Sequence, residues 1–407
     1  MKISISDLEA FKSASSHSHI KELTTSSENG NGLIGQMKAR RALNILKSSI
    51  MKNPASGRII ILKGEKGTGK TALAMALSKS LGNVPINMIN ASELFCLDIS
   101  ITESLVQAIR KSVTLEIRRT CRVVMGEVVA KRESSITLKT EIMESKYEMG
   151  EQLMLAIEKM NIAENDVIRI NLETGKISKL GRTKPHDGNF LNPGDRIVSC
   201  PENEIEQIVS DAEEVTLHEL DVINSRTDGK RNLFSGNSGE IPSEIRNEVN
   251  SKVSEWISEE SASLKAGILF IDESKILNSE CYSFLNKILE EKWNPILILA
   301  TNCMNTNNYK ISGIPADFLD RALTITTQSY TKEECSAILQ LRAQEENISV
   351  PHVVLEKLAV MALESGLRYA LNILSMSSIV NKGTEISLKS IEKIYDIFID
   401  LKRTKTF

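Results

Sequence analysis

The sequence has few aromatic residues, no surplus of positive charge and no long apolar run, and each absence excludes a class of protein. Aromatic residues make up 4% of the 407 residues, which argues against a surface built for stacking single-stranded bases. Lysine and arginine number 50 against 53 acidic residues, a net charge of -3, so the whole chain is not an electrostatic nucleic-acid binder. Because no apolar run approaches membrane-spanning length, we expect no contact with a membrane.

The cysteines and the N-terminal residues indicate a reducing compartment. No C-x-x-C pair occurs, so neither a zinc site nor a disulfide framework is expected from the six cysteines, Cys96, Cys121, Cys200, Cys281, Cys303 and Cys335. Residues 1–20 also lack the apolar segment of a secretory signal.

A chain of this length is too long for one compact core, and its patterns change along the sequence. Strand-like and helix-like segments alternate up to residue 117, as in a parallel sheet covered by helices. Short β-type runs fill 118–214, α/β character returns in 215–328, and 329–407 is helical. The sequence therefore predicts an α/β core (1–117 and 215–328), an inserted β domain and a C-terminal helical domain.

Several elements can be placed from local signals. The polar stretch TTSSENGNG (24–32) predicts a flexible connection, with ordered structure starting near Leu33. A hairpin is expected around Thr174 and Gly175. Thr331 and Glu334 form a capping box for the first C-terminal helix. Four residues recur at helical spacing in the last helix and are expected to be buried: Ile391, Ile394, Tyr395 and Phe398. A buried strand is expected at RIIIL (58–62), two further apolar strands at GILFID (267–272) and PILILAT (295–301), and a final short strand at ALTITT (322–327).

The segment GEKGTGKT (64–71) has the pattern of a phosphate-binding loop, between the strand RIIIL and a helix-forming run. Its glycines allow consecutive backbone N–H groups to face phosphate oxygens, and the helix N-terminus adds positive potential. Lys70 can reach the β- and γ-phosphates, and the Thr71 hydroxyl can coordinate magnesium. The predicted nucleotide contacts are Gly64, Gly67, Thr68, Gly69, Lys70, Thr71 and Ala72.

Polar side chains follow two of the other apolar strands. Asp272 and Glu273 end the strand GILFID, at the edge of the sheet that would face the nucleotide. Asp272 can hold magnesium through water, and Glu273 can deprotonate the attacking water; alternatively Asp272 only caps a helix. Asn302 follows PILILAT and suits a γ-phosphate sensor, although taken by itself a loop-forming asparagine is the favoured interpretation.

In this order, the motifs resemble those of an AAA+ ATPase rather than a GTPase, which would need an N-K-x-D guanine reader. The two N-K pairs, NKIL at 286 and NKGT at 381, lack the aspartate. Longer stretches are similar to the eukaryotic RuvB-like family, and VINSRTDG followed by LFSGNSGEI is closer to its reptin branch than to the pontin branch. The matching stretches are HSHIKEL, LIGQMKARRA, LHELDVINSR, GIPADFLDR and SGLRYALNIL.

The resemblance implies a fold and further site residues. The fold is an AAA+ P-loop ATPase core with a parallel sheet, an inserted OB-like β domain and a C-terminal helical lid. Arg321 matches the arginine finger, which would act in trans on a neighbouring subunit's γ-phosphate, and Arg368 matches the second sensor arginine. The adenine-pocket segment falls on Ile34, Gly35 and Gln36. The H-S-H motif, thought to fold over the nucleotide, falls on His17 and His19, which otherwise lie in a disordered tail within 1–32.

The sequence also departs from the family pattern. Ser274 and Lys275 stand where the family has V-H after the two acidic residues, the loop after Asn302 is short, and Ser312 replaces a histidine. We expect these changes to affect the coupling of nucleotide state to ring contacts more than hydrolysis. The insertion is abbreviated. The basic cluster near its start fits either nucleic acid or a protein partner, and consists of Arg118, Arg119, Arg122, Lys131 and Arg132.

The resemblance implies an ATPase that binds ATP or ADP with Mg²⁺. Its expected partners are a pontin-type paralogue in a hetero-hexameric or double-hexameric ring, chromatin-remodelling and histone acetyltransferase complexes, and a co-chaperone assembly complex. The expected location is the nucleus, with a cytoplasmic pool. Two alternatives stay open, an ATP-gated scaffold with incidental turnover and a DNA helicase or translocase like bacterial RuvB, the latter weakened by the charge balance.

Overall fold

The computed structural model divides the chain into two compact units. The first comprises Met1–Leu115, Val215–Ser254 and Leu264–Phe407, and the second Glu116–Glu214 and Glu255–Ser263. The structure describes residues 20, 23, 29–30, 32–52, 58–82, 84–95, 99–131, 135–148, 150, 153–155, 157, 160, 162, 165–172, 175, 177–183, 198, 201, 204–227, 240–290, 293–302, 313–346, 348–380 and 386–400.

The first unit contains a five-stranded parallel sheet in the order β14-β3-β13-β12-β4. Strands that are neighbours in space lie far apart in the sequence, as expected when helices connect parallel strands. All five strands therefore end at the same edge. Their bounds are β3 Ile59–Lys63, β4 Ile86–Asn90, β12 Ile268–Asp272, β13 Ile296–Thr301 and β14 Ala322–Thr326.

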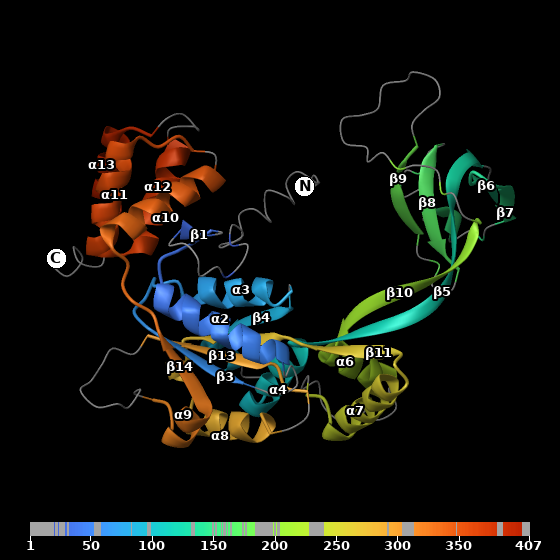
Figure 1. Ribbon diagram of the computed structural model, residues 1–407, viewed down its shortest axis with the longest axis horizontal. Helices are drawn as coiled ribbons and strands as arrows, with labels where there is room; N and C mark the ends of the chain where they lie inside the picture. Colours follow the sequence, from blue (N-terminus) through green and yellow to red (C-terminus); the bar gives the residue numbers. More distant parts are fainter. Residues whose placement is uncertain are drawn as a thin grey trace. The chain divides into compact units, whose positions relative to one another are not determined.

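Helices cover both faces of this sheet (Figure 1). Successive side chains of a strand point to opposite faces, so β3 sends Ile60 and Leu62 into one apolar layer and Ile59 and Ile61 into the other. The central strands are therefore apolar throughout rather than alternating. The first layer is closed by α2 (Met37–Lys52) and α3 (Lys70–Ser80), and the second by α4 (Ile101–Lys111), α8 (Ser279–Ile288) and α9 (Ala316–Arg321).

Two further helices, α6 (Leu217–Thr227) and α7 (Ser243–Ser258), join the first unit through a buried ionic network. Asp221 is fully buried and accepts a 2.7 Å hydrogen bond from Nη2 of Arg110 on α4. Arg246 on α7 pairs with Glu103 on α4. Because a buried carboxylate is costly without partners, this network fixes the three helices to one another.

The C-terminal part of the first unit is a bundle of four helices with its own apolar core. The first of these helices begins at the capping box of Thr331 and Glu334, as the sequence predicts. The bounds are α10 Lys332–Glu345, α11 His352–Ser365, α12 Leu367–Val380 and α13 Leu388–Ile397. None of the helices in the described part of the chain is long and apolar enough to cross a membrane.

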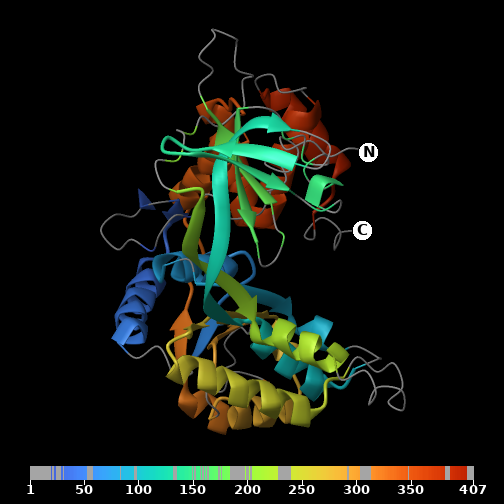
Figure 2. The same ribbon diagram turned by 90° about the vertical axis from the view of Figure 1, so that its right-hand side faces the viewer.

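The second unit is an antiparallel β domain, whose long strand β5 is the cyan-green arrow in Figure 2. The predicted hairpin is present as β8 paired with β9, and Gly175 turns it with φ of 66°. Thr174 lies outside the described residues. The strands are β5 Val113–Lys131, β6 Ser135–Lys139, β7 Glu144–Glu148, β8 Asp166–Asn171, β9 Ile177–Arg182 and β10 Glu206–Thr216, with β11 Ala262–Ala266 also pairing with β5.

Two local predictions are wrong. Ordered structure does not start near Leu33, because Ile20 and Leu23 are buried in the first apolar layer and Nζ of Lys79 bonds to the Ile20 carbonyl oxygen. Phe398 is not part of the buried stripe, since α13 ends one residue earlier and the side chain is 47% exposed. The four strands predicted for the core are confirmed within one residue at each end.

Gly267 offers a test of how tightly the central sheet is packed. A Cβ built on this residue would lie 1.9 Å from the Ser112 carbonyl oxygen and 2.7 Å from that of Pro85. Backbone atoms cannot rotate away, so we expect Gly267→Ala to destabilise the protein by about 1–3 kcal/mol. Chemical denaturation measures this. Gly150→Ala, whose Cβ would meet open space, is the matched control; equal stability of the two variants would contradict the packing argument.

Candidate nucleotide-binding site

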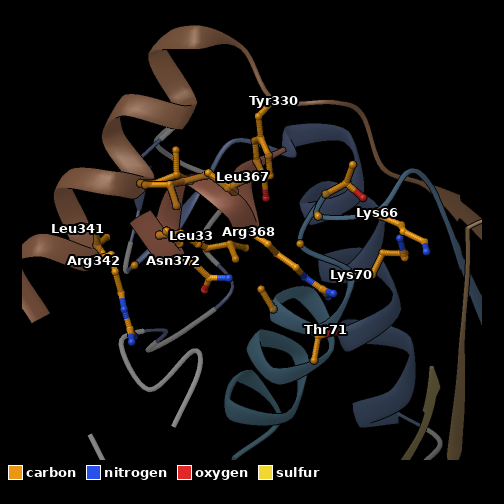
Figure 3. Close-up of a pocket in the computed structure, with 18 of the residues that line it drawn as sticks. Leu33, Lys66, Lys70, Thr71, Tyr330, Leu341, Arg342, Leu367, Arg368 and Asn372 are labelled. Atoms are coloured by element: carbon orange, nitrogen blue, oxygen red, sulfur yellow. The ribbon is translucent and has the colours of Figure 1, made fainter. Parts of the chain in front are cut away.

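A cavity of about 370 Å³ lies at the carboxyl edge of the parallel sheet, within the range of small-molecule sites. The P-loop, the ends of β12 and β13, and the lid helices α10 and α12 contribute to its wall (Figure 3). The P-loop and the strand ends contribute lysines and carboxylates, whereas the lid contributes several apolar side chains together with Arg342 and Arg368. The predicted residues that line it are Ile34, Gly67, Thr68, Gly69, Lys70, Thr71, Ala72, Asp272, Glu273, Asn302 and Arg368.

The start of the P-loop is pressed against the segment that links the sheet to the lid. A Cβ on Gly64 would lie 1.9 Å from Thr327 Oγ1, so only glycine fits there. Gly64 does not line the cavity itself. The same Thr327 hydroxyl oxygen lies 2.7 Å from Thr68 Oγ1. The backbone N–H of Thr327 donates to the Lys63 carbonyl oxygen at 2.8 Å. The linker therefore fixes the path of the loop.

The end of the P-loop is constrained in the same way. Gly69 has φ of 81°, and a Cβ on it would lie 2.5 Å from the Tyr330 hydroxyl oxygen. Burial, with the Glu334 carboxylate nearby, raises the pKa of Tyr330 to about 12, so this phenol stays neutral. Tyr330 is therefore an uncharged wall of the cavity.

Lys70 is buried at the first position of α3 and bonds to the loop's own backbone. Its ammonium donates to the carbonyl oxygens of Gly64 at 3.0 Å and Glu65 at 2.7 Å. Burial lowers the pKa of Lys70, the Asp272 carboxylate opposes this shift, and the Arg368 guanidinium adds to it. Two cations and a carboxylate thus act on one another in this part of the cavity, which suits a polyanionic ligand with a metal ion.

Glu273 has a strained backbone. Its φ of 53° lies in the left-handed region, which residues with a Cβ rarely adopt. The Glu273 N–H donates a hydrogen bond to Oδ1 of Asp272 at 2.9 Å. The strain turns the chain directly after β12, so that Asp272 and Glu273 both line the cavity.

The residue after the acidic pair holds this turn in place. Ser274 is fully buried, its hydroxyl donates to the Ala300 carbonyl oxygen at 3.1 Å, and its own carbonyl oxygen accepts from the Tyr282 hydroxyl at 2.7 Å. The serine that departs from the family pattern is therefore bonded on both sides to the core.

Comparison with known families agrees with this geometry. Residues 13–333 match the TIP49 P-loop domain, and residues 338–400 match the TIP49 AAA-lid domain. The protein belongs to the TIP49 family. It is accordingly a RuvB-like AAA+ ATPase of the pontin and reptin group, and its P-loop domain implies nucleotide binding.

Of the predicted adenine-pocket segment of this TIP49 protein, only Ile34 lines the cavity. Gly35 lies against the lid, where a Cβ would be 2.4 Å from Glu334 Oε1. Gln36 faces the linker, donating from Nε2 to the Gln328 carbonyl oxygen at 2.5 Å and accepting from its N–H at 3.0 Å. Gln36 therefore holds the linker, and neither residue forms part of the wall.

The two predicted arginines lie in different places. Arg368 on α12 reaches toward the P-loop in Figure 3 and lines the cavity. Arg321 does not line it: the side chain is 52% exposed and pairs with Glu290 at 2.6 Å. Arg321 therefore does not reach the cavity of its own chain. His17 and His19 lie outside the described residues.

Sequence reasoning missed the contribution of the lid, of Lys66 in the P-loop, of Gly32 and Leu33, and of Tyr330 in the linker. The spacing of Ile338, Leu341 and Arg342 on α10 indicates one helical face. In the sequence, however, a helix face that lines a cavity has the same periodicity as one that packs into a core. The lining residues not predicted are Gly32, Leu33, Lys66, Tyr330, Ile338, Leu341, Arg342, Leu367, Leu371, Asn372 and Ser375.

Two substitutions in this TIP49 protein separate binding from hydrolysis. Lys70→Ala removes a buried ammonium from the cavity, and we expect ATP affinity to fall at least about tenfold. Glu273→Gln keeps the shape but removes the carboxylate, so ATP should still bind while turnover is lost. Calorimetric titration and phosphate release measure the two quantities. Turnover of the Glu273→Gln protein at the wild-type rate would exclude Glu273 as the base.

Proposed function

We propose that this protein is a reptin-type ring subunit that hydrolyses ATP to drive assembly or remodelling of nuclear multiprotein complexes. The observation that supports it most is the division of the site. The cavity gathers the P-loop, the acidic pair, Asn302 and Arg368, whereas Arg321 lies on the exposed surface. Such a chain can bind ATP alone but needs a neighbour's arginine for full transition-state stabilisation.

The residues present fit magnesium. Thr71 and Asp272 line the same cavity as the phosphate-binding loop. No group of three His, Cys, Asp or Glu side chains able to hold a metal occurs among the described residues. This donor set suits Mg²⁺, which is usually held by one or two protein oxygens together with phosphate oxygens and water. When bound, the ion would neutralise charge on the β- and γ-phosphates.

The chain's own groups then have separate tasks. The Glu273 carboxylate accepts a proton from the attacking water, which Asn302 orients from the end of β13. The Lys70 ammonium and the Arg368 guanidinium stabilise negative charge on the phosphates. The turn held by Ser274 keeps the Glu273 carboxylate at the cavity rather than on the surface.

The wider role rests on the family and on the reptin-like segments of the sequence. The proposed partners are a pontin-type paralogue in a hetero-hexameric or double-hexameric ring, chromatin-remodelling and histone acetyltransferase complexes, and a co-chaperone assembly complex. The proposed location is the nucleus, with a cytoplasmic pool. Nucleic-acid contact through the β insertion and a helicase activity are weaker proposals, since the net charge of -3 gives no general attraction to DNA.

An ATP-gated scaffold with incidental turnover is the second candidate. Ile20 is fully buried in the first apolar layer, and its carbonyl oxygen accepts from Lys79 on α3. The residue that follows the H-S-H motif is therefore anchored to the ATPase core. An anchored N-terminal segment over the nucleotide would slow exchange, and slow exchange favours a switch over a motor.

Steady-state ATP hydrolysis, alone and mixed with the organism's pontin-type paralogue, tests the two candidates. We expect the mixture to form a ring of about six subunits, measured by mass, with turnover above the sum of the parts, because arginine fingers then act across subunit boundaries. A ring with negligible turnover, whose partner binding still changes with nucleotide, would instead support the scaffold.

Arg321 gives a sharper test of action across subunits. Arg321→Ala should leave ATP affinity within about twofold, since the side chain is exposed outside the cavity. Turnover of the assembled ring should fall at least about a hundredfold. Glu290→Ala, which removes only the exposed partner of Arg321, is the control and should keep turnover. A loss of ATP affinity in isolated Arg321→Ala subunits would contradict the assignment.

A further inference from the structure

Lys66 is a second lysine of the P-loop to which the phosphate-binding pattern gives no role. It lies between Gly64 and Gly67, and it lines the nucleotide cavity although it is exposed. The pattern GxxxxGK[ST] leaves this position free, so nothing in the motif requires a charge here.

The Lys66 ammonium has no hydrogen-bond or ion-pair partner among the described residues. The carboxylate of its neighbour Glu65 forms no ion pair with Lys66 and accepts from the Ser329 hydroxyl at 2.9 Å instead. Arg342, another cation lining the cavity, is engaged by Glu346 at 2.7 Å and Glu345 at 3.4 Å. Lys66 is therefore a cation at the cavity whose charge no described side chain offsets.

The path of the loop places Lys66 near the γ-phosphate rather than the α-phosphate. The later part of the loop opens α3, and backbone N–H groups at such a helix N-terminus cradle the α- and β-phosphates. The early part lies beside β13 instead, because the Gly64 N–H donates to the Thr301 carbonyl oxygen at 3.2 Å. Asn302, the proposed γ-phosphate sensor, is the next residue.

The direction of the side chain agrees with this placement. In Figure 3 the ammonium groups of Lys66 and Lys70 lie at one end of the view, and Leu341 and Arg342 lie at the other. The first end carries the charged groups expected around phosphates, and the second is bounded by the lid. A flexible lysine stem at the charged end can move its ammonium onto a phosphate oxygen.

We propose that Lys66 is an additional ligand of the γ-phosphate, supplied by the same chain that holds the nucleotide. A magnesium-bound triphosphate keeps net negative charge on its terminal group, and an ammonium without a partner gains a charge-assisted hydrogen bond there. The diphosphate product lacks this group, so Lys66 favours ATP over ADP. The inference rests on the proposed ATPase activity and adds a residue that distinguishes the triphosphate from the diphosphate.

The ratio of ATP to ADP affinity tests the assignment. We would titrate the full chain and its Lys66→Met variant by calorimetry with Mg²⁺, using a non-hydrolysable ATP analogue and ADP. We expect the analogue to bind about tenfold more weakly to the variant, with ADP affinity changed less than about twofold. Lys66→Arg should restore most of the preference, because it keeps the positive charge. Lys38→Met, on the exposed part of α2, is the control.

Each other outcome overturns the proposal. Unchanged affinity for the analogue means that Lys66 is a solvated surface lysine. Equal losses for the analogue and ADP mean that it acts on the inner phosphates or on the loop's conformation. If the wild-type protein binds neither nucleotide, the proposed function fails instead, so the two failures are distinguishable.

Discussion

The site depends on the close contact between the P-loop and the linker that leads from β14 to the lid. Thr327 occupies the space that a Cβ on Gly64 would need, and Tyr330 occupies the corresponding space at Gly69. Glycine is therefore required twice in this loop, for contact with the protein's own chain as well as for approach to phosphates. Because the linker is fixed to the loop, α10 begins at a defined place beside the nucleotide.

This contact links the binding site to the position of the lid. Gln328 exchanges two hydrogen bonds with Gln36, and Ser329 bonds to Glu65 at the start of the loop. A displacement of the P-loop on binding phosphate would thus act on three consecutive linker positions, Thr327 to Ser329. For nucleotide state to be coupled to the lid, one element must change its position with both the P-loop and the lid. In this chain the linker is the candidate for that element.

The sequence predicted those parts of the molecule whose signals are local. Four apolar strands, the P-loop and the Thr331 capping box depend on neighbouring residues, and the structure has each of them. The inward face of the lid and the linking role of Gln36 depend on contacts such as that with Gln328, 292 residues away. The predicted burial of Phe398 was wrong for a related reason, because helical periodicity does not specify where α13 ends. Arg321 and Arg368 were singled out only by the family motifs in which they stand.

The placement of positive charge supports the proposal that one chain binds ATP and still requires a neighbour. Lys70 and Arg368 are held at the cavity, and burial of Lys70 beside Arg368 already lowers its pKa. Adding a further fixed arginine there would raise this repulsion in every state without a triphosphate. The proposed arginine finger, Arg321, lies on the exposed surface and avoids that cost, because in the proposed ring its charge would reach the phosphates only after assembly. Lys66 lies between these two arrangements, because its flexible stem is exposed at the rim of the cavity. In the proposed role its ammonium binds the γ-phosphate when a triphosphate is present and stays hydrated otherwise.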